Sequence, residues 1–418
     1  MFKRHLTGLW QHPDFMKLWA GQTISEFGSR ITREALPLVA VIVLAATPAE
    51  MGILTAISAL PVLLFSLAAG VWVDRVRRRP VMIAADIARL VLLLSVPFAA
   101  FTGTLTIELV YIIAALTTLL GLVFEIAYRA ILPSLISREH LLEGNTKLAT
   151  TDSLAEIGGP AIAGLLVQII SAPMAIVFDA LSYLFSSLSF ALIRAPEPPP
   201  APSNAAPNVW GEMLDGWRCI AADPILRVLV IEISIGNFFG SFYAVLYSLY
   251  VIRDLGLSPA QLGLVVGAGG IGALLGALVA GWIPRRYRLG QVLTTCILFG
   301  ASLNVLIPLA GGTPIFAAAV LITGQILGDG TRTVYEINAL SLRQNLVPDR
   351  LLGRVNASIG FLAHGIAPVG ALVGGALATA LDARTTLFIA FVGLLAGALW
   401  VARSPVRKLQ TYGEVVQS

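Results

Sequence analysis

The chain has 418 residues, of which 57% are hydrophobic and only 12% are charged, and its mean hydropathy is +0.83. A soluble domain usually carries about 25% charged residues, so this chain has too little polar surface for water and is expected to lie in a lipid bilayer. The two cysteines, Cys219 and Cys296, lie far apart and predict neither a disulfide framework nor a metal site. The net charge of +4 is not a nucleic-acid signal, because the basic residues gather on one side of the predicted membrane.

Twelve apolar segments follow one another along the chain, each long enough for the roughly 20 residues that a helix needs to cross a bilayer. In the loops on one side, only Arg253 and Arg384 are basic, whereas the termini and the loops on the other side hold most of the Lys and Arg. The positive-inside rule therefore places both termini in the cytoplasm. The predicted spans are 17–45, 50–73, 80–102, 107–132, 147–170, 173–194, 224–251, 259–283, 290–311, 314–342, 351–380 and 385–402.

The two halves of the chain repeat each other at an offset of 211 residues. Residues 48–53, PAEMGI, match residues 259–264, PAQLGL, and Phe124-Glu125-Ile126 matches Tyr335-Glu336-Ile337. Internal repeats in a membrane chain are typical of secondary transporters, whose substrate site lies between the repeats. The prediction is an all-α membrane protein with twelve transmembrane helices in two six-helix bundles. Its domains are residues 1–195, a cytoplasmic Pro-rich linker and surface helix at 196–222, and residues 223–418.

The eighth span contains Gly267-x-Gly269-x-x-Gly272, which matches a dinucleotide-binding fingerprint in its letters only. No strand precedes it, so close helix packing through small residues is the better interpretation. The sequence has no GxxxxGK[ST] motif and no set of nucleophile and base or of metal ligands. The chain is therefore expected to be no enzyme, to need no cofactor or metal, and not to use ATP.

The loop between the second and third spans reads GVWVDRVRRRP from Gly70 to Pro80, and it resembles the signature loop of the major facilitator superfamily. Arg77 replaces the usual glycine. The resemblance implies that Asp74 holds the two halves together on the cytoplasmic side, where a helix N-terminus or an arginine such as Arg354 would be its partner. The alternative is a basic loop that only anchors topology. The residues that match the signature are Gly70, Asp74, Arg75, Arg78 and Arg79.

The fifth span contains Gly158-Gly159-Pro160 followed by Gly164, which partly resembles the Gly-Pro-x-x-Gly-Gly motif of proton-coupled exporters in the superfamily. Ala163 stands where the first of the paired glycines is expected. A proline kink with close helix packing is the physical content of this motif. With the segments at 132–135 and 351–356, the chain resembles the branch of enterobactin exporters and macrolide efflux proteins. That resemblance implies an exporter in the bacterial cytoplasmic (inner) membrane that works by proton exchange.

Ionisable residues inside spans are the next clue, because a charge at the bilayer centre costs roughly 2.5–3.5 kcal/mol and should face a cavity or a partner. Glu26, Arg30, Arg33 and Glu34 form one polar stripe on the first span. Glu26 is the candidate proton-coupling residue beside Arg30, and Arg33 and Glu34 are candidate cavity residues. An i,i+4 ion pair of Glu26 with Arg30 is the equally weighted alternative.

The tenth span carries a counterpart stripe in the second half. It is interpreted as cavity lining, with Asp329 as the second proton-coupling candidate, or else as a buried structural pair with Arg332. Other acids within or near spans, such as Glu156, Asp179 and Glu232, are each interpreted as partners in interhelical hydrogen bonds. Aromatic residues on the seventh span indicate a wall for a lipophilic solute or a lipid-facing surface. The cavity candidates of the second half are Phe239, Phe242, Tyr243, Gln325 and Arg332.

The expected function is thus a proton-coupled exporter of lipophilic small molecules, such as drugs, macrolides or siderophores, by alternating access. The expected partners are the small-molecule substrate, protons and the bilayer, with no nucleic acid, and a monomer is the expected functional unit. An importer or facilitator on the same fold, or a membrane sensor or scaffold that transports nothing, are the alternatives, because fold alone does not settle function.

Overall fold

The computed structural model describes residues 8–197 and 209–411, and within these ranges the regular structure is helical. Helices satisfy their own backbone hydrogen bonds, which an apolar chain in lipid requires. The chain divides into two compact units, residues 1–45 with 57–206, and residues 46–56 with 207–418. The middle of the predicted proline-rich linker, residues 198–208, lies outside the described residues.

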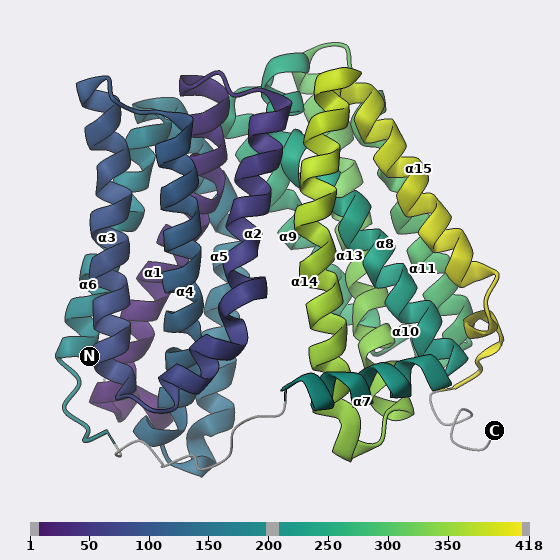
Figure 1. Cartoon of the computed structure of the whole chain (residues 1–418), viewed down its shortest axis with the longest axis horizontal. Coiled ribbons are helices and arrows are strands. Elements are labelled where there is room, and N and C mark those ends of the chain that lie inside the picture. The colour runs from purple at the N-terminus through teal and green to yellow at the C-terminus, as the bar shows by residue number, and fades with distance from the viewer. Residues whose placement is uncertain (1–7, 198–208, 412–418) are drawn as a thin grey trace, which may run out of the picture. The chain divides into compact units, whose positions relative to one another are not determined.

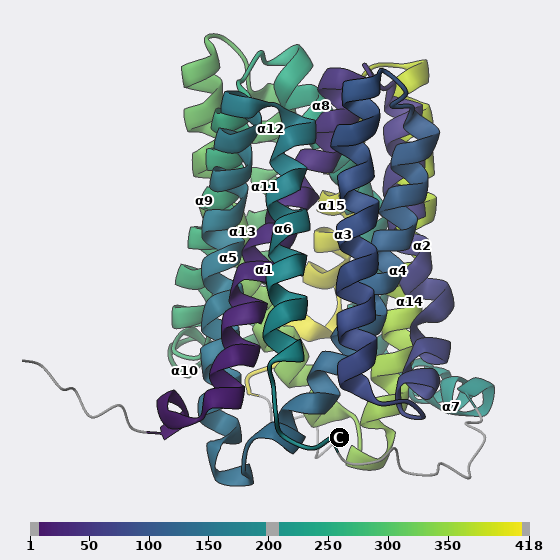
Figure 2. The ribbon, with the colours of Figure 1, turned by 90° about the vertical axis from the view of Figure 1, so that its left-hand side faces the viewer.

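In the first unit, α1 packs on α5 and α6, and α3 packs on α4 and α6. Figure 2 shows α6 lying in front of α1, with α5 and α3 to either side. Gly21 and Gly28 of α1 allow this close packing, because a side chain at either position would meet the serines of α6. The helices are α1 (Pro13–Leu38), α2 (Pro48–Val73), α3 (Arg78–Thr102), α4 (Ile107–Leu135), α5 (Leu141–Ile170) and α6 (Ala172–Ala191). Only the part of α2 from residue 57 onward belongs to this unit.

In the second unit, α9 packs closely on α13, and α8 lies against α14 and α15. Gly272 faces the backbone of Ile326, and Gly276 faces that of Gly330, which confirms close packing as the role of the glycine-rich span. The helices are α7 (Val209–Ala222), α8 (Pro224–Leu249), α9 (Pro259–Ala280), α10 (Ile283–Arg286), α11 (Leu289–Leu303), α12 (Leu306–Leu309), α13 (Pro314–Leu346), α14 (Asp349–Ala380) and α15 (Ala383–Ala402).

α7, which follows the linker, runs across the ends of α8 and α14 (Figure 1). Its buried face contributes Ile220 and the partly buried Trp217 to a core cluster with both helices. Gly216 lies directly on the backbone of Arg354. The helix is therefore an integral part of the second unit.

The internal repeat is visible in the backbone. α1 ends in a π-helical turn, Val39–Val43, and α8 ends in a π-helical turn, Tyr250–Asp254, at the same offset as the sequence repeat. A residue with positive φ follows each turn, Ala45 at 52° and Gly256 at 67°. The helix pairings of α1 with α5 and α6 recur as those of α8 with α14 and α15.

Eleven of the described helical segments are long and apolar enough to cross a membrane. α1 is not among them although it has 26 residues, about 39 Å at 1.5 Å per residue, because it carries the predicted stripe of ionisable residues. With α1 as the twelfth, the predicted all-α fold is confirmed, and the predicted spans agree with the observed helices to within a few residues at most ends.

Candidate transport site

The polar stripe of α1 is built around Arg30, which binds two acids. Its Nε and Nη2 donate to Glu26 Oε1 at 3.2 and 3.0 Å, one helical turn earlier. Its Nη1 pairs with Glu156 of α5. The side chains of Arg30 and Glu26 are 13% and 20% exposed, whereas Glu156 is 53% exposed. The ion pair of Glu26 and Arg30 therefore exists, and a second carboxylate shares the same cation.

The glycine motif of α5 packs directly against the side chain of Arg30. Gly159 is buried and faces Arg30 so closely that an added side-chain carbon would lie 2.9 Å from Arg30 Cγ and closer still to its Cβ. Pro160 and Gly164 are buried on the same helix. The motif therefore packs α5 closely against α1, as predicted. This close approach at Gly159 brings Arg30 within reach of Glu156, which lies three residues before Gly159 on α5.

The other two residues of the stripe differ in their surroundings. Arg33 is exposed and Glu34 is half-buried. Their role in contact with a solute stays a prediction.

The predicted stripe on α13 consists of Gln325, Asp329, Arg332 and Glu336, and the structure separates it into two pairs. The side chains of Asp329 and Gln325 lie against Gly269 of α9, within the packed α9–α13 contact. Arg332 Nε donates to Glu336 Oε1 at 2.7 Å, and both of these side chains are more than half exposed. Arg332 therefore pairs with Glu336, and Asp329 lies in the contact between α13 and α9.

The aromatic residues of α8 pack mainly on one another and on α14 and α15. The rings of Phe238, Phe239 and Phe242 lie with centroids 5.0–5.5 Å apart. Phe242 is 1% exposed and sits on Gly374, and Phe239 sits on Gly393. The hydroxyl of Tyr243 donates to Leu387 O at 3.2 Å. In this structure Phe242 serves the packing of the unit, while Phe239 and Tyr243 are half-buried.

The signature loop is held in place by the linker. The backbone N–H groups of Arg78 and Arg79 both donate to the carboxylate of Glu197, with 3.2 Å for the Arg79 bond, and this carboxylate thereby caps the N-terminus of α3. Asp74 and Arg75 are exposed, and Gly70 has open space where a side chain would lie.

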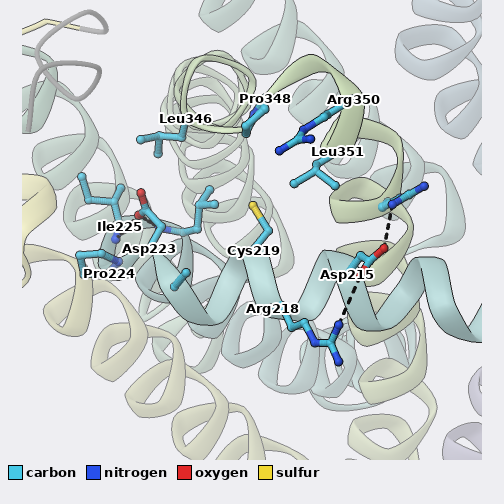
Figure 3. A pocket seen from close by; sticks show the side chains of 13 residues that line it. Asp215, Arg218, Cys219, Asp223, Pro224, Ile225, Leu346, Pro348, Arg350 and Leu351 are labelled. Atoms are coloured by element: carbon cyan, nitrogen blue, oxygen red, sulfur yellow. Dashed lines mark hydrogen bonds and ion pairs between the residues drawn. The ribbon is translucent and has the colours of Figure 1, made fainter.

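Arg354, the expected partner of Asp74, binds an acid of its own unit. Its Nη1 donates to Asp215 Oδ2 of α7 at 2.7 Å, and Arg218 lies 3.6 Å from the other oxygen of this carboxylate. A cavity of about 1070 Å³ opens beside this ion pair, between α7, the start of α8, the end of α13 and the start of α14 (Figure 3). Burial raises the pKa of Cys219 in its wall, so this thiol stays protonated at neutral pH.

The sequence did not identify a buried charge cluster in the first unit. Asp86 and Arg89 of α3 form an ion pair, and Asp179 of α6 lies beside them. The exposed fractions of Asp86, Arg89 and Asp179 are 0%, 6% and 0%. The available signal was the presence of three ionisable residues in two apolar spans. By contrast, Glu232 was interpreted correctly, since it accepts an interhelical hydrogen bond from Tyr335 at 2.9 Å.

In the part of the chain that the structure describes, eleven apolar helices and a polar first helix in two repeats define a secondary transporter of the major facilitator type. The model of the transmembrane secretion effector family matches residues 8–416, and the chain belongs to this family of the major facilitator superfamily. It is a multi-pass membrane transporter, and the prediction that it is no enzyme is confirmed by the family.

Several curated relatives that match are efflux proteins. The chain is 28% identical to the multidrug efflux pump Tap of Mycolicibacterium fortuitum over 361 residues, 84% of this chain and 86% of the relative. It is 24% identical to macrolide efflux protein A of Streptococcus pyogenes over 371 residues, 87% of this chain and 89% of the relative. These similarities support the predicted branch of the superfamily.

Solved structures share the fold at low sequence identity. A bacterial homologue of the iron transporter ferroportin, in its inward-facing state, superposes with a TM-score of 0.75 at 14% identity, covering 93% of this chain and 99% of the other. A variant of the nucleoside transporter NupG superposes with a TM-score of 0.76 at 12% identity, covering 94% and 99%. Both similarities bear on the fold alone.

Proposed function

We propose that the chain exports lipophilic small molecules from the bacterial cytoplasm in exchange for protons. The observation that carries the proposal is the sharing of Arg30 by Glu26 and Glu156, in a chain with efflux proteins among its matching relatives. Two carboxylates and one guanidinium carry a net charge of −1, so a proton or a cationic group of a solute neutralises the cluster. Glu26 is the proposed proton carrier because it is the less exposed of the two acids.

The proposed cycle uses the opposing effects of burial and of a cation on a carboxyl group. Desolvation favours the protonated form, and a nearby cation favours the ionised form. If Arg30 shifts between Glu26 and Glu156 as the bundles rock, Glu26 loads a proton in one state and releases it in the other. The proposed solute-contacting residues are Arg33 and Glu34 on α1, Gln325 and Arg332 on α13, and Phe239 and Tyr243 on α8. Asp329 on α13 is the second candidate proton carrier.

The proposed orientation has both termini and the 196–222 segment in the cytoplasm, with the bundles 1–195 and 223–418 as the moving halves of a monomer. Asp74, together with Gly70, Arg75 and Arg78, is the proposed cytoplasmic gate. Support comes from the capped, ordered start of α3 that follows this loop. Arg354 in the second turn of α14 is a proposed gate residue that alternates between Asp215 and Asp74.

The energetics are adequate for export against a gradient. One proton that crosses a potential of 100 mV gains about 2.3 kcal/mol, which supports roughly a fifty-fold concentration ratio of a neutral solute. The site therefore needs no second energy source for a modest gradient.

The test is the accumulation of radiolabelled erythromycin, a macrolide, in bacterial cells with and without the chain, each with and without an uncoupler. We expect lower accumulation in cells that carry the chain, and a return to the control level when the uncoupler is added. Lower accumulation that the uncoupler leaves unchanged would refute proton coupling. Higher accumulation in the cells that carry the chain would indicate import.

A further inference from the structure

The charge cluster of α3 and α6 lies apart from the proposed site at Glu26. Successive residues lie about 100° apart around a helix, so the face of α1 that contacts α6 through Gly28 and Thr32 is roughly opposite the face of Glu26 and Arg30. Gly28 lies directly on Asp179 and Ser182. α1 therefore separates two polar clusters, one toward α5 and one toward α6.

Arg89 is enclosed on all sides that the structure describes. Its guanidinium carbon lies 4.6 Å from the ring centroid of Phe124 and 4.2 Å from that of Tyr183. Its Nη2 donates to Asp86 Oδ1. Stacking between two rings and pairing with one carboxylate compensate its single positive charge, and its Nε is buried without a hydrogen-bond partner.

The second carboxyl of the cluster has no cation of its own. Asp86 and Arg89 together are neutral, so an ionised Asp179 would be a buried, uncompensated negative charge, which is the costly arrangement in a protein interior. Arg89 and Tyr183 are the other titratable groups that face it.

The neighbouring helices add no further charge to the cluster. α1 faces it with the hydroxyls of Ser29 and Thr32, and α4 faces it with the ring of Phe124. α5, which also packs on α6, directs Glu156 to Arg30 instead. Charge balance in the cluster therefore requires one more positive charge than the described side chains supply.

Ser182 offers the Asp179 carboxyl little compensation for a negative charge. Ser182 Oγ lies 2.7 Å from Asp179 O and 3.1 Å from Asp179 Oδ1. A hydroxyl has one hydrogen to donate. That one hydrogen is divided between the backbone carbonyl and Oδ1, so Ser182 gives the Asp179 carboxyl at most a partial hydrogen bond.

The other oxygens of the cluster complete the pattern. Asp179 Oδ2 and Asp86 Oδ2 are fully buried without a hydrogen-bond partner. The hydroxyls of Thr32 and Ser186 face the two carboxyls, but neither reaches hydrogen-bond geometry. Two ionised carboxylates would leave these buried oxygens unsatisfied, whereas a protonated carboxyl lowers the cost.

We propose that Asp86, Arg89 and Asp179 form a proton-binding site, with the proton on Asp179 in the state described here. Loss of this proton leaves a net charge of −1 between α1, α3 and α6, and the packing of α6 must loosen to hydrate it. Proton binding at this site is thereby coupled to the conformation of the first unit. The transport consequence rests on the proposed function, but the bound proton does not.

The proton is tested by infrared spectroscopy of the full-length protein in nanodiscs, which resolves the carbonyl stretch of a protonated carboxyl. We expect this band at neutral pH in the wild type and its loss in Asp179→Asn. It should also vanish in Asp86→Asn, because Asp179 then becomes the counterion of Arg89. Arg89→Gln should double it, since both carboxyls must then be protonated.

Glu125→Gln is the matched control. Glu125 is an acid in a span, but it is 44% exposed and pairs with Arg129 one turn away, so the band should survive its replacement. Absence of the band from the wild type at neutral pH would overturn the proposal, even if Arg89→Gln fails to fold. Equal band intensity in the wild type and in Asp179→Asn would overturn it as well.

Coupling is tested separately, by the pH dependence of erythromycin export in everted vesicles. We expect Asp179→Asn to flatten the pH profile and Glu125→Gln to retain it. An unchanged profile for Asp179→Asn, in a wild type that exports and responds to an uncoupler, would overturn the coupling. If the wild type does not export, the proposed function fails, and the infrared band still decides the proton site.

Discussion

Replacing Gly159 with alanine tests whether the glycine motif of α5 is needed for the close packing of α5 against Arg30. The new methyl group would lie 2.9 Å from Arg30 Cγ and nearer still to Arg30 Cβ. Ordinary contacts between such atoms begin near 3.4 Å. Because Cβ is fixed to the backbone of α1, rotation of the side chain cannot relieve the contact, and α1 and α5 must separate by more than half an ångström.

The expected magnitude follows from two opposing effects. Overpacking of this kind costs about 1–3 kcal/mol, while exchange of glycine for alanine within a helix gains up to about 1 kcal/mol. Gly159→Ala should therefore change stability by between about 0 and 2 kcal/mol in the unfavourable direction. Gly158→Ala has the same helix gain, and its methyl group would lie 3.5 Å from the Phe27 ring, an ordinary contact, so it should not destabilise.

Both variants and the wild type should be compared by thermal unfolding in one detergent and by erythromycin export from cells. We expect a lower unfolding midpoint and weaker export for Gly159→Ala, because displacement of Arg30 weakens its contact with Glu156. Gly158→Ala should match or exceed the wild type in both assays. Equal unfolding midpoints and equal export for the two alanine variants would refute the idea that Gly159 is needed for the contact with Arg30.

Three further changes test other parts of the chain. Glu26→Gln should abolish uphill export while leaving downhill exchange, and uphill export with an unchanged pH profile would make Glu26 structural. Asp74→Asn should slow export about tenfold, equivalent to about 1.4 kcal/mol in the barrier, at normal expression, and near-normal export would remove it from the gate. Gly272→Ala should lower the unfolding midpoint by the equivalent of about 1–2 kcal/mol, because its methyl group would meet the backbone of Ile326. Gly328→Ala, with nothing within 4 Å, should not, and equal midpoints would contradict close packing of α9 on α13.

The fold was predictable because its signals are local or repeated. The lengths of the apolar segments predicted the number and bounds of the helices. The repeat offset predicted which helices of the two halves correspond, and the paired π-helical turns Val39–Val43 and Tyr250–Asp254 follow the same offset. The pair of Glu26 and Arg30 was also predictable, since both residues lie on one helix at i,i+4.

Partners on other helices were not predictable from spacing. Glu156 and Gly159 meet Arg30 only because α5 packs on α1, and Asp179 meets Arg89 only because α6 packs on α3. From the sequence, the simplest interpretation of each acid by itself was that it takes part in one interhelical hydrogen bond. The sequence shows which spans carry charge, but the packing of helices determines how those charges combine.

The polarity of α1 has a consequence for how the protein is made. A helix with four ionisable side chains in its span inserts poorly by itself, at roughly 2.5–3.5 kcal/mol for each charge near the bilayer centre. Arg30 pairs with Glu26 of the same helix and also with Glu156, which belongs to α5 and is synthesised after α1. Stable membrane integration of the first helix is therefore expected to wait for the fifth, so that mutations in α5 should impair biogenesis and expression level before they impair transport.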